Sequence, residues 1–239
     1  MSRVGTVESL WRYPVKSMRG EELDEIFVGA AGVAGDRLYA FRSSAARAEF
    51  PYFTGREQRQ MLLYRPRFRE SADAAGIVDV ETPDGDTVAI DDPALIDRLR
   101  AGADPKHEVT LMRSERSMAD AYPVSIMSVQ TPARLALETA TAPEKRRYRA
   151  NIYIDLPGTD GYGEDQFVGR SLRIGRDVVV SVAKRDTRCM MITLDPDTAA
   201  QAPVLLKQIA QAHGGTAGIY GSVVGEGTVR KGDAVELVD

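Results

Sequence analysis

Cysteine is almost absent from this chain of 239 residues, and histidine is nearly as scarce. The single cysteine, Cys189, cannot form an internal disulfide bond, which agrees with a reducing compartment. One thiolate also cannot hold an iron–sulfur cluster, which needs several. The two histidines, His107 and His213, lie far apart and outside any ligand-spaced motif, so a structural zinc site is not expected. Any chemistry that needs sulfur therefore depends on Cys189.

Long apolar runs and an excess of positive charge are absent as well. No segment approaches the roughly 20 apolar residues that a membrane helix needs, and the first five residues lack the apolar core of a signal peptide. We therefore expect a cytoplasmic protein that does not bind membranes. The net charge of −4 disfavours a nucleic-acid binder. An anionic ligand would have to be held by a local cluster of Arg and Lys.

Short apolar runs separated by Gly, Pro and Asp predict strands in the first half of the chain. A helix is predicted from Asp92, which can cap it, and Pro93, which suits the first helical position. The segment 102–107 carries Gly, Asp and Pro and is the predicted domain boundary. The predicted strands are 4–12, 25–28, 37–41, 60–64, 77–81 and 87–90, with a hairpin turn at 83–86.

The second half combines strands with two helices, which begin near Pro132 and Pro203. Strands are predicted at 108–112, 124–129, 151–156 and 178–183, and the segment 169–175 is predicted to be a short strand between two turns. The glycine-rich tail suits the closing strands of a barrel. We predict a predominantly β protein of the α+β class. A sheet-rich domain (1–105) would precede a β-barrel domain with a few helices (106–239), and a ligand would bind in the cleft between them.

The segment around the cysteine is strongly cationic. Lys184, Arg185 and Arg188 lie within five residues of Cys189. Nearby cations favour a thiolate, which is the form that attacks or binds metal, and a thiolate suits thiophilic metals. The alternative is that a lone cysteine before Met-Met-Ile is a small buried hydrophobic residue.

Further basic segments occur in both halves, often beside a hydroxyl or amide side chain. An Arg grips phosphate through two parallel hydrogen bonds, whereas Lys acts as a point charge. Each cluster alone is more often a solvated surface than a binding site, and no glycine-rich nucleotide loop accompanies them. The segments are Tyr13-Pro-Val-Lys-Ser17, Gly35-Asp-Arg37, Thr54-Gly-Arg56 and Lys145-Arg-Arg-Tyr-Arg149.

Taken in order, these segments resemble the MOSC family, the molybdenum cofactor sulfurase C-terminal domain with its N-terminal β-barrel companion. The resemblance runs over nearly the whole chain. Its most specific element is Arg188-Cys-Met-Met-Ile-Thr-Leu-Asp-Pro-Asp197. Weaker elements in matching order are Leu10 to Ser17, Gly35 to Tyr39, Phe53 to Arg56, Asp120 to Ser128, Arg149 to Ile152, Glu164-Asp165 with Gly169, Gly218 to Gly221 and Gly227 to Asp233.

The resemblance implies a bound molybdenum cofactor, in which molybdenum is chelated by a pterin dithiolene. Cys189 matches the family cysteine that ligates the metal and would be both the metal ligand and the catalytic residue. Pyridoxal phosphate is not expected. The positions that match cofactor-binding residues of the family are Lys16, Ser17, Arg37, Asp120, Arg149, Asn151, Thr187 and Arg188.

The nearest functional relatives implied are the amidoxime-reducing proteins and bacterial reductases of N-hydroxylated bases. The chain would then reduce an N-oxygenated small molecule at an oxo-molybdenum centre. With one cysteine, it has no room for a fused ferredoxin-like domain, so a separate ferredoxin- or flavin-type electron donor is expected. Four positions depart from the family pattern: Met18, Ala121, Tyr122 and Ala150.

Two other functions remain open at this stage. The chain could be a sulfur carrier in which Cys189 holds a persulfide for the maturation of a cofactor or another enzyme. It lacks a cysteine desulfurase domain and would need a partner to supply the sulfur. Alternatively, it could bind or transport the pterin cofactor without performing chemistry.

Overall fold

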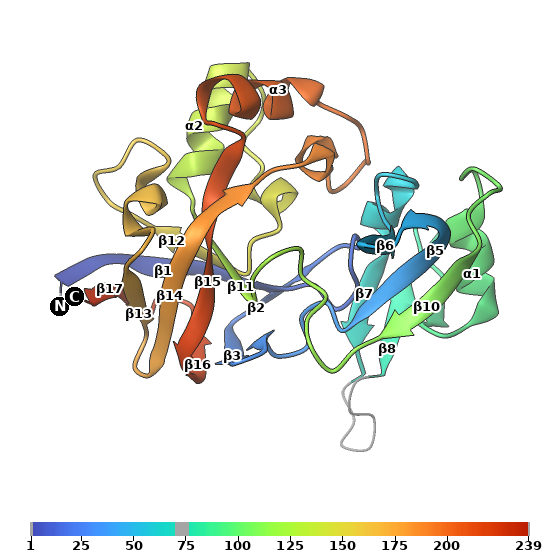
Figure 1. Cartoon of the computed structure of the whole chain (residues 1–239), viewed down its shortest axis with the longest axis horizontal. Coiled ribbons are helices and arrows are strands. Elements are labelled where there is room, and N and C mark those ends of the chain that lie inside the picture. Colours follow the sequence, from blue (N-terminus) through green and yellow to red (C-terminus); the bar gives the residue numbers. More distant parts are fainter. Residues whose placement is uncertain (1, 70–76, 239) are drawn as a thin grey trace.

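The computed structural model describes residues 2–69 and 77–238, and it confirms a predominantly β protein of the α+β class. Figure 1 shows a barrel on one side and a smaller sheet-rich unit on the other. Each has its own apolar core. None of the helices in the described part of the chain has the length and apolar character that a membrane crossing requires.

Seven strands close the barrel, in the order β1-β12-β11-β15-β14-β13-β17 and back to β1. Only β11 and β12 run parallel among these neighbours. On β14, buried Val178, Val180 and Val182 alternate with less buried residues, because successive side chains point to opposite faces. The bounds are β1 (Ser2–Arg12), β11 (Val124–Ser128), β12 (Ile152–Asp155), β13 (Ser171–Ile174), β14 (Val178–Thr187), β15 (Thr216–Gly225) and β17 (Ala234–Val238).

The first strand is long enough to have three partners. Residues 2–6 of β1 pair with β17, residues 6–10 pair with β12, and residues 10–12 pair with β2 (Glu21–Leu23). Gly5 lies where β1 comes close to β12, and a Cβ atom there would lie 2.1 Å from the carbonyl oxygen of Asp155. Only glycine fits at this point of the barrel.

The smaller unit contains two three-stranded sheets and one described helix, α1 (Pro93–Arg100). Asp92 caps α1 as predicted, because its carboxylate accepts from the amide of Ala94 at 2.8 Å. In a further small sheet, β3 pairs with β4 on one side and with β16, from near the end of the chain, on the other. The bounds are β3 (Glu25–Gly29), β4 (Gly32–Val33), β5 (Tyr39–Arg47), β6 (Phe50–Phe53), β7 (Arg65–Phe68), β8 (Val78–Glu81), β9 (Thr87–Ala89), β10 (Val109–Arg113) and β16 (Gly227–Arg230).

Two helices, α2 (Gln130–Thr139) and α3 (Pro203–Ala212), lie side by side at the top of the barrel in Figure 1. A third core fills the space beneath them and includes Trp11, Tyr13 and Tyr153. Short 3-10 helices occupy η1 (Arg59–Leu63), η2 (Lys145–Tyr148), η3 (Gly163–Phe167) and η4 (Met190–Thr193).

Two sequence-based predictions differ from the structure. The apolar run 60–64 is not a strand but lies mostly in η1, because a short apolar run fits a buried helical turn as well as a strand. The predicted division at residue 105 also does not separate the two cores. Strand β1 belongs to the barrel, and β10, beyond the boundary, pairs with β5 in the smaller unit.

Candidate functional site

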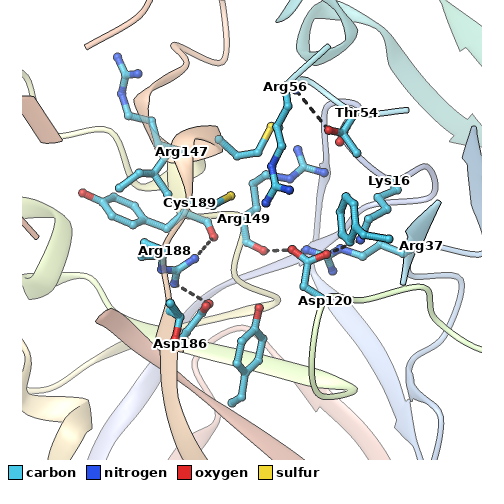
Figure 2. A pocket seen from close by; sticks show the side chains of 17 residues that line it. Lys16, Arg37, Thr54, Arg56, Asp120, Arg147, Arg149, Asp186, Arg188 and Cys189 are labelled. Carbon is cyan, nitrogen blue, oxygen red and sulfur yellow. Dashed lines mark hydrogen bonds and ion pairs between the residues drawn. The ribbon is translucent and has the colours of Figure 1, made fainter. Parts of the chain in front are cut away.

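A cleft lies between the barrel and the smaller unit, and Figure 2 shows the side chains that line it. Of the nine site residues predicted from the sequence, eight line this cleft and one, Asn151, does not. The lining residues are Lys16, Ser17, Arg37, Phe50, Thr54, Arg56, Asp120, Arg147, Tyr148, Arg149, Asp186, Thr187, Arg188, Cys189, Met191, Ile192 and Tyr220.

Cys189 lies two residues after the end of β14 and is only partly buried, so its sulfur is accessible from the cleft. Arg56 reaches it from the smaller unit, and the hydrogen bond to Cys189 raises the pKa of Arg56. The guanidinium of Arg56 also lies 4.9 Å from the centre of the Phe50 ring. The thiol is therefore in contact with a cation from the opposite wall and is not sealed inside hydrocarbon.

Arg37 is held by a fully buried carboxylate, that of Asp36. Asp36 also accepts from the amide of Tyr13 at 2.9 Å, and Arg37 donates to the carbonyl of Arg149 at 3.0 Å. Burial disfavours the charged guanidinium, but the facing Asp36 carboxylate prevails and raises the pKa of Arg37. Arg37 is thus a fixed positive charge at the base of the cleft.

Arg149 has no such carboxylate. It donates to the carbonyl of Met18 at 2.6 Å and lies 4.4 Å from the centre of the Tyr13 ring. Burial and the neighbouring charge of Arg37 lower the pKa of Arg149 to about 10. Its Nη2 atom is buried and, among the residues that the structure describes, has no hydrogen-bond partner. An uncompensated buried donor of this kind is expected where an anion binds.

Lys16 is also buried, with 5% of its surface exposed. Its ammonium donates to the carbonyl of Met118 at 2.8 Å and to the carboxylate of Asp120. Burial lowers the pKa of Lys16, and Arg37 and Arg149 add to this effect, whereas Asp120 opposes it. The ammonium also lies 4.7 Å from the centre of the Tyr52 ring.

Three cleft residues adopt the left-handed backbone conformation that usually favours glycine. The φ angles are 67° at Ser17, 49° at Arg37 and 55° at Arg149. Such conformations cost about 1–3 kcal/mol each for non-glycine residues and are concentrated at functional sites. Here each occurs in a connection next to a strand or a 3-10 helix, where it directs a polar side chain toward the cleft.

Arg188 is held by bonds to the backbone and to a carboxylate near the cleft wall. Its guanidinium donates to the carbonyls of Ala217 and Tyr148, each at 2.7 Å, and pairs with Asp186 at 2.8 Å. It therefore fixes the loop that carries Cys189, although it also forms part of the cleft wall.

Asn151 is buried and its side chain is bound elsewhere. Its amide oxygen accepts from the backbone and the hydroxyl of Ser125, at 3.2 and 3.0 Å, and its amide nitrogen donates to the carbonyl of Trp11 at 3.3 Å. The predicted direct contact with a cofactor is therefore corrected here: Asn151 ties β11 to β1 and supports the loop of Arg149.

Several lining residues had no assigned role in the sequence analysis. Arg56 and Thr54 lie in a basic segment that the sequence singles out, and Arg147 lies in another. Asp186 had only one signal, an acidic residue among the cations of 184–188. Tyr220 lies in the element Gly218 to Gly221 of the resemblance, but no role was expected for it, because an aromatic residue in a barrel strand is ordinarily a packing residue.

The donor set of the cleft fits an anionic group that carries a thiophilic metal. Six cationic side chains face two acidic ones in the lining. Within the described chain, the Nε atom of Arg147 and the Nη2 atom of Arg149 are buried without partners. The partly buried Cys189 could supply one soft ligand. A lining of this kind fits a ligand that carries both a phosphate and a thiophilic metal, and Lys16, Ser17, Arg37 and Arg149 are the residues that would hold its anionic part.

Comparison with solved structures identifies similar folds. The crystal structure of the YuaD protein from Bacillus subtilis matches with a TM-score of 0.52 and 14% sequence identity, over 98% of this chain and 94% of that chain. YiiM from Geobacillus stearothermophilus has a TM-score of 0.40 and 16% identity, over 54% of this chain and 67% of that one. The first likeness supports the fold. No curated protein matches the chain significantly.

Two family models cover the chain between them. The MOSC N-terminal beta barrel domain matches residues 4–122, and the MOSC domain matches residues 113–236. Their overlap at 113–122 includes Asp120, in the connection between the two halves. On this evidence the chain belongs to the MOSC family, with an N-terminal MOSC beta barrel domain joined to a MOSC domain.

Proposed function

We propose that this chain binds a molybdenum–pterin cofactor through Cys189 and reduces N-hydroxylated small molecules. The observation that carries the proposal is an accessible thiol in a cleft whose cations come from both halves of the chain, two of them with unpaired buried nitrogens. A solvated surface cluster would leave its guanidinium nitrogens in water. These nitrogens are instead removed from water without a partner among the described residues.

Different residues of the cleft would bind different groups of the cofactor. Arg37 and Arg149 flank the Tyr13 ring, at 4.7 and 4.4 Å from its centre, and together would neutralise a phosphate. Lys16 and the hydroxyl of Ser17 would bind polar groups of the pterin. Cys189 would ligate the metal, and Arg188 holds the loop that presents the thiol.

The bound cofactor would supply the two-electron chemistry, and the protein would supply binding, orientation and electrostatic stabilisation. The electrons would come from a separate ferredoxin- or flavin-type donor protein. Reduction of benzamidoxime by molybdenum-loaded protein with NADH and no added partner would contradict that part of the proposal.

The metal site is tested by elemental analysis and pterin fluorescence of freshly purified protein. We expect about one molybdenum per chain for the wild type and a loss of at least about tenfold for Cys189→Ser. Met190→Leu is a matched control, because Met190 lies against α3 on another surface and not in the cleft. Equal molybdenum in wild type and Cys189→Ser would overturn the assignment of the ligand.

The same preparation separates the alternative functions. Absence of molybdenum together with a mass increase of one sulfur atom on Cys189 would favour the sulfur carrier. Bound cofactor with no reduction of benzamidoxime or another N-hydroxylated compound, in the presence of a competent donor, would favour a carrier or store of the cofactor.

A further inference from the structure

Asp186 is a buried carboxylic acid in the cleft wall, with 2% of its surface exposed. It lies near the end of β14, three residues before Cys189. Its carboxylate pairs with Arg188 at 2.8 Å and is hydrogen-bonded to the hydroxyl of Tyr220 on β15. Figure 2 shows Asp186 beside Arg188, on the cleft wall below Cys189. The proposed contacts with the cofactor do not involve Asp186.

The surroundings of Asp186 set its proton affinity. Burial raises its pKa to about 6, although Arg188, Tyr220 and the more distant Arg37 favour the ionised form. Asp120, across the cleft, disfavours ionisation further. A carboxyl group that titrates near neutrality can exchange protons in both directions during turnover.

Tyr220 is itself held in place. Its ring stacks on that of Tyr122 with centroids 6.3 Å apart, and the ammonium of Lys184 lies 5.7 Å from the centre of the Tyr122 ring. The hydroxyl of Tyr220 is therefore directed at Asp186 by the packing of its ring. Burial raises the pKa of Tyr220, so the hydroxyl stays protonated and acts as a donor to the carboxylate.

The proposed reaction consumes protons that the rest of the cleft is poorly suited to provide. Cleavage of an N–OH bond takes up two electrons and two protons and yields an N–H bond and water. The Arg and Lys side chains must remain charged to hold an anion, and Cys189 is the metal ligand. The carboxylate of Asp120 is exposed and paired with Lys16.

We propose that Asp186, positioned by Tyr220, is the general acid that protonates the oxygen cleaved from the substrate nitrogen. The inference rests on the proposed function. As the N–O bond breaks, the carboxyl proton passes to the departing oxygen, which leaves as water. The two electrons come from the ferredoxin- or flavin-type donor protein. A second proton, from solvent, ends on the nitrogen, and solvent then reprotonates the Asp186 carboxylate.

The test compares loaded wild type with Asp186→Asn and Tyr220→Phe by molybdenum content and by kcat/KM for benzamidoxime against pH. Because the acid must be protonated, wild-type kcat/KM should fall as pH rises through about 6. Asp186→Asn should retain molybdenum and KM, lose about 100-fold in kcat and lose this fall with pH. In Tyr220→Phe the fall should move to higher pH, because the lost hydrogen bond favoured the carboxylate. Asp177→Asn, an exposed acid at the other end of β14, is the matched control and should behave as wild type.

A second readout needs neither cofactor nor turnover. Infrared difference spectra of the unloaded chain should show a carboxyl group that titrates near pH 6 and is missing in Asp186→Asn. A loaded Asp186→Asn protein with wild-type kcat and pH profile would overturn the inference and leave the proposed function standing. If the Asp186→Asn variant loses molybdenum, the Tyr220→Phe variant decides instead. A wild-type dependence of kcat/KM on pH in Tyr220→Phe would then overturn the inference and leave the proposed function standing. Wild type that carries molybdenum but reduces no N-hydroxylated compound would overturn both.

Discussion

Replacement of Asp36 by Asn should destabilise the whole protein far more than the loss of one surface charge. The carboxylate is fully buried, accepts from Tyr13 and pairs with Arg37, whose side chain is 13% exposed. Asn keeps the shape and one acceptor but leaves the guanidinium charge unpaired. Removal of one partner of a buried pair costs about 3–5 kcal/mol.

The lower end of that range applies here. Arg37 keeps its bond to the carbonyl of Arg149 at 3.0 Å, and the cleft gives its guanidinium some access to water. We expect a loss of about 3 kcal/mol, which corresponds to about a hundredfold rise in the unfolding equilibrium constant.

Urea unfolding followed by tryptophan fluorescence measures this loss directly. Trp11 is the single tryptophan, is buried and lies on β1, two residues before Tyr13. Glu81→Gln is the control, because its pair with Arg65 is exposed on both sides and such pairs contribute less than about 1 kcal/mol. A loss within 1 kcal/mol for Asp36→Asn, with an unchanged denaturant slope, would refute the argument that this buried pair anchors the cleft.

Three further predictions follow from other parts of the molecule. Gly5→Ala should lower the free energy of unfolding by about 3 kcal/mol in the same urea assay, because the added Cβ meets the Asp155 carbonyl. Gly29→Ala is the control, because Gly29 is also a strand residue without a positive φ and its added Cβ would come no closer than 3.1 Å to the side chain of Phe27. Arg149→Met should weaken cofactor retention at least about tenfold, as measured by molybdenum content, whereas Arg176→Met, on an exposed side chain, should not change it. Glu138 is partly desolvated, but hydrogen bonds from His213 and Arg134 lower its pKa to about 2. The stability that ionised Glu138 adds is complete above about pH 4.5 and is lost as pH falls toward 2. The difference in unfolding free energy between wild type and Glu138→Gln should therefore become smaller over that interval. A difference that does not change with pH would contradict this.

The sequence predicts which residue types line the cleft better than it predicts the directions and hydrogen-bond partners of their side chains. Residues in short motifs, such as Lys16 and Cys189, can be assigned because residue type and order together carry the family resemblance. Asn151 belongs to such a motif, yet its amide lies behind the cleft, since a motif fixes position along the chain and not the direction of a side chain. Asp186 acquires its properties only from burial and from Tyr220, which lies 34 residues away in sequence.

For the fold as well, local sequence patterns identify single elements but not the pairing of strands that lie far apart in the chain. A run of valines identifies the first part of β14, and the Asp92–Pro93 pair identifies the start of α1. The membership of β1 in the barrel could not be read from local pattern, because its partners β12 and β17 lie far along the chain. For the same reason, a boundary placed at the segment 102–107 separates strands that pair with each other, such as β1 from β12 and β5 from β10.

The pairing of β1 with β17 has a consequence for how the protein is made. The first strand leaves the ribosome long before its neighbour at 234–238 exists, and Figure 1 shows the two ends of the chain side by side. The smaller unit, built largely from consecutive strands of residues 39–113, can assemble during synthesis, whereas closure of the barrel must wait for the last strand. Because Lys16 follows β1 and Cys189 follows β14, two strands of this barrel, we expect loading of the cleft to follow the synthesis of β17.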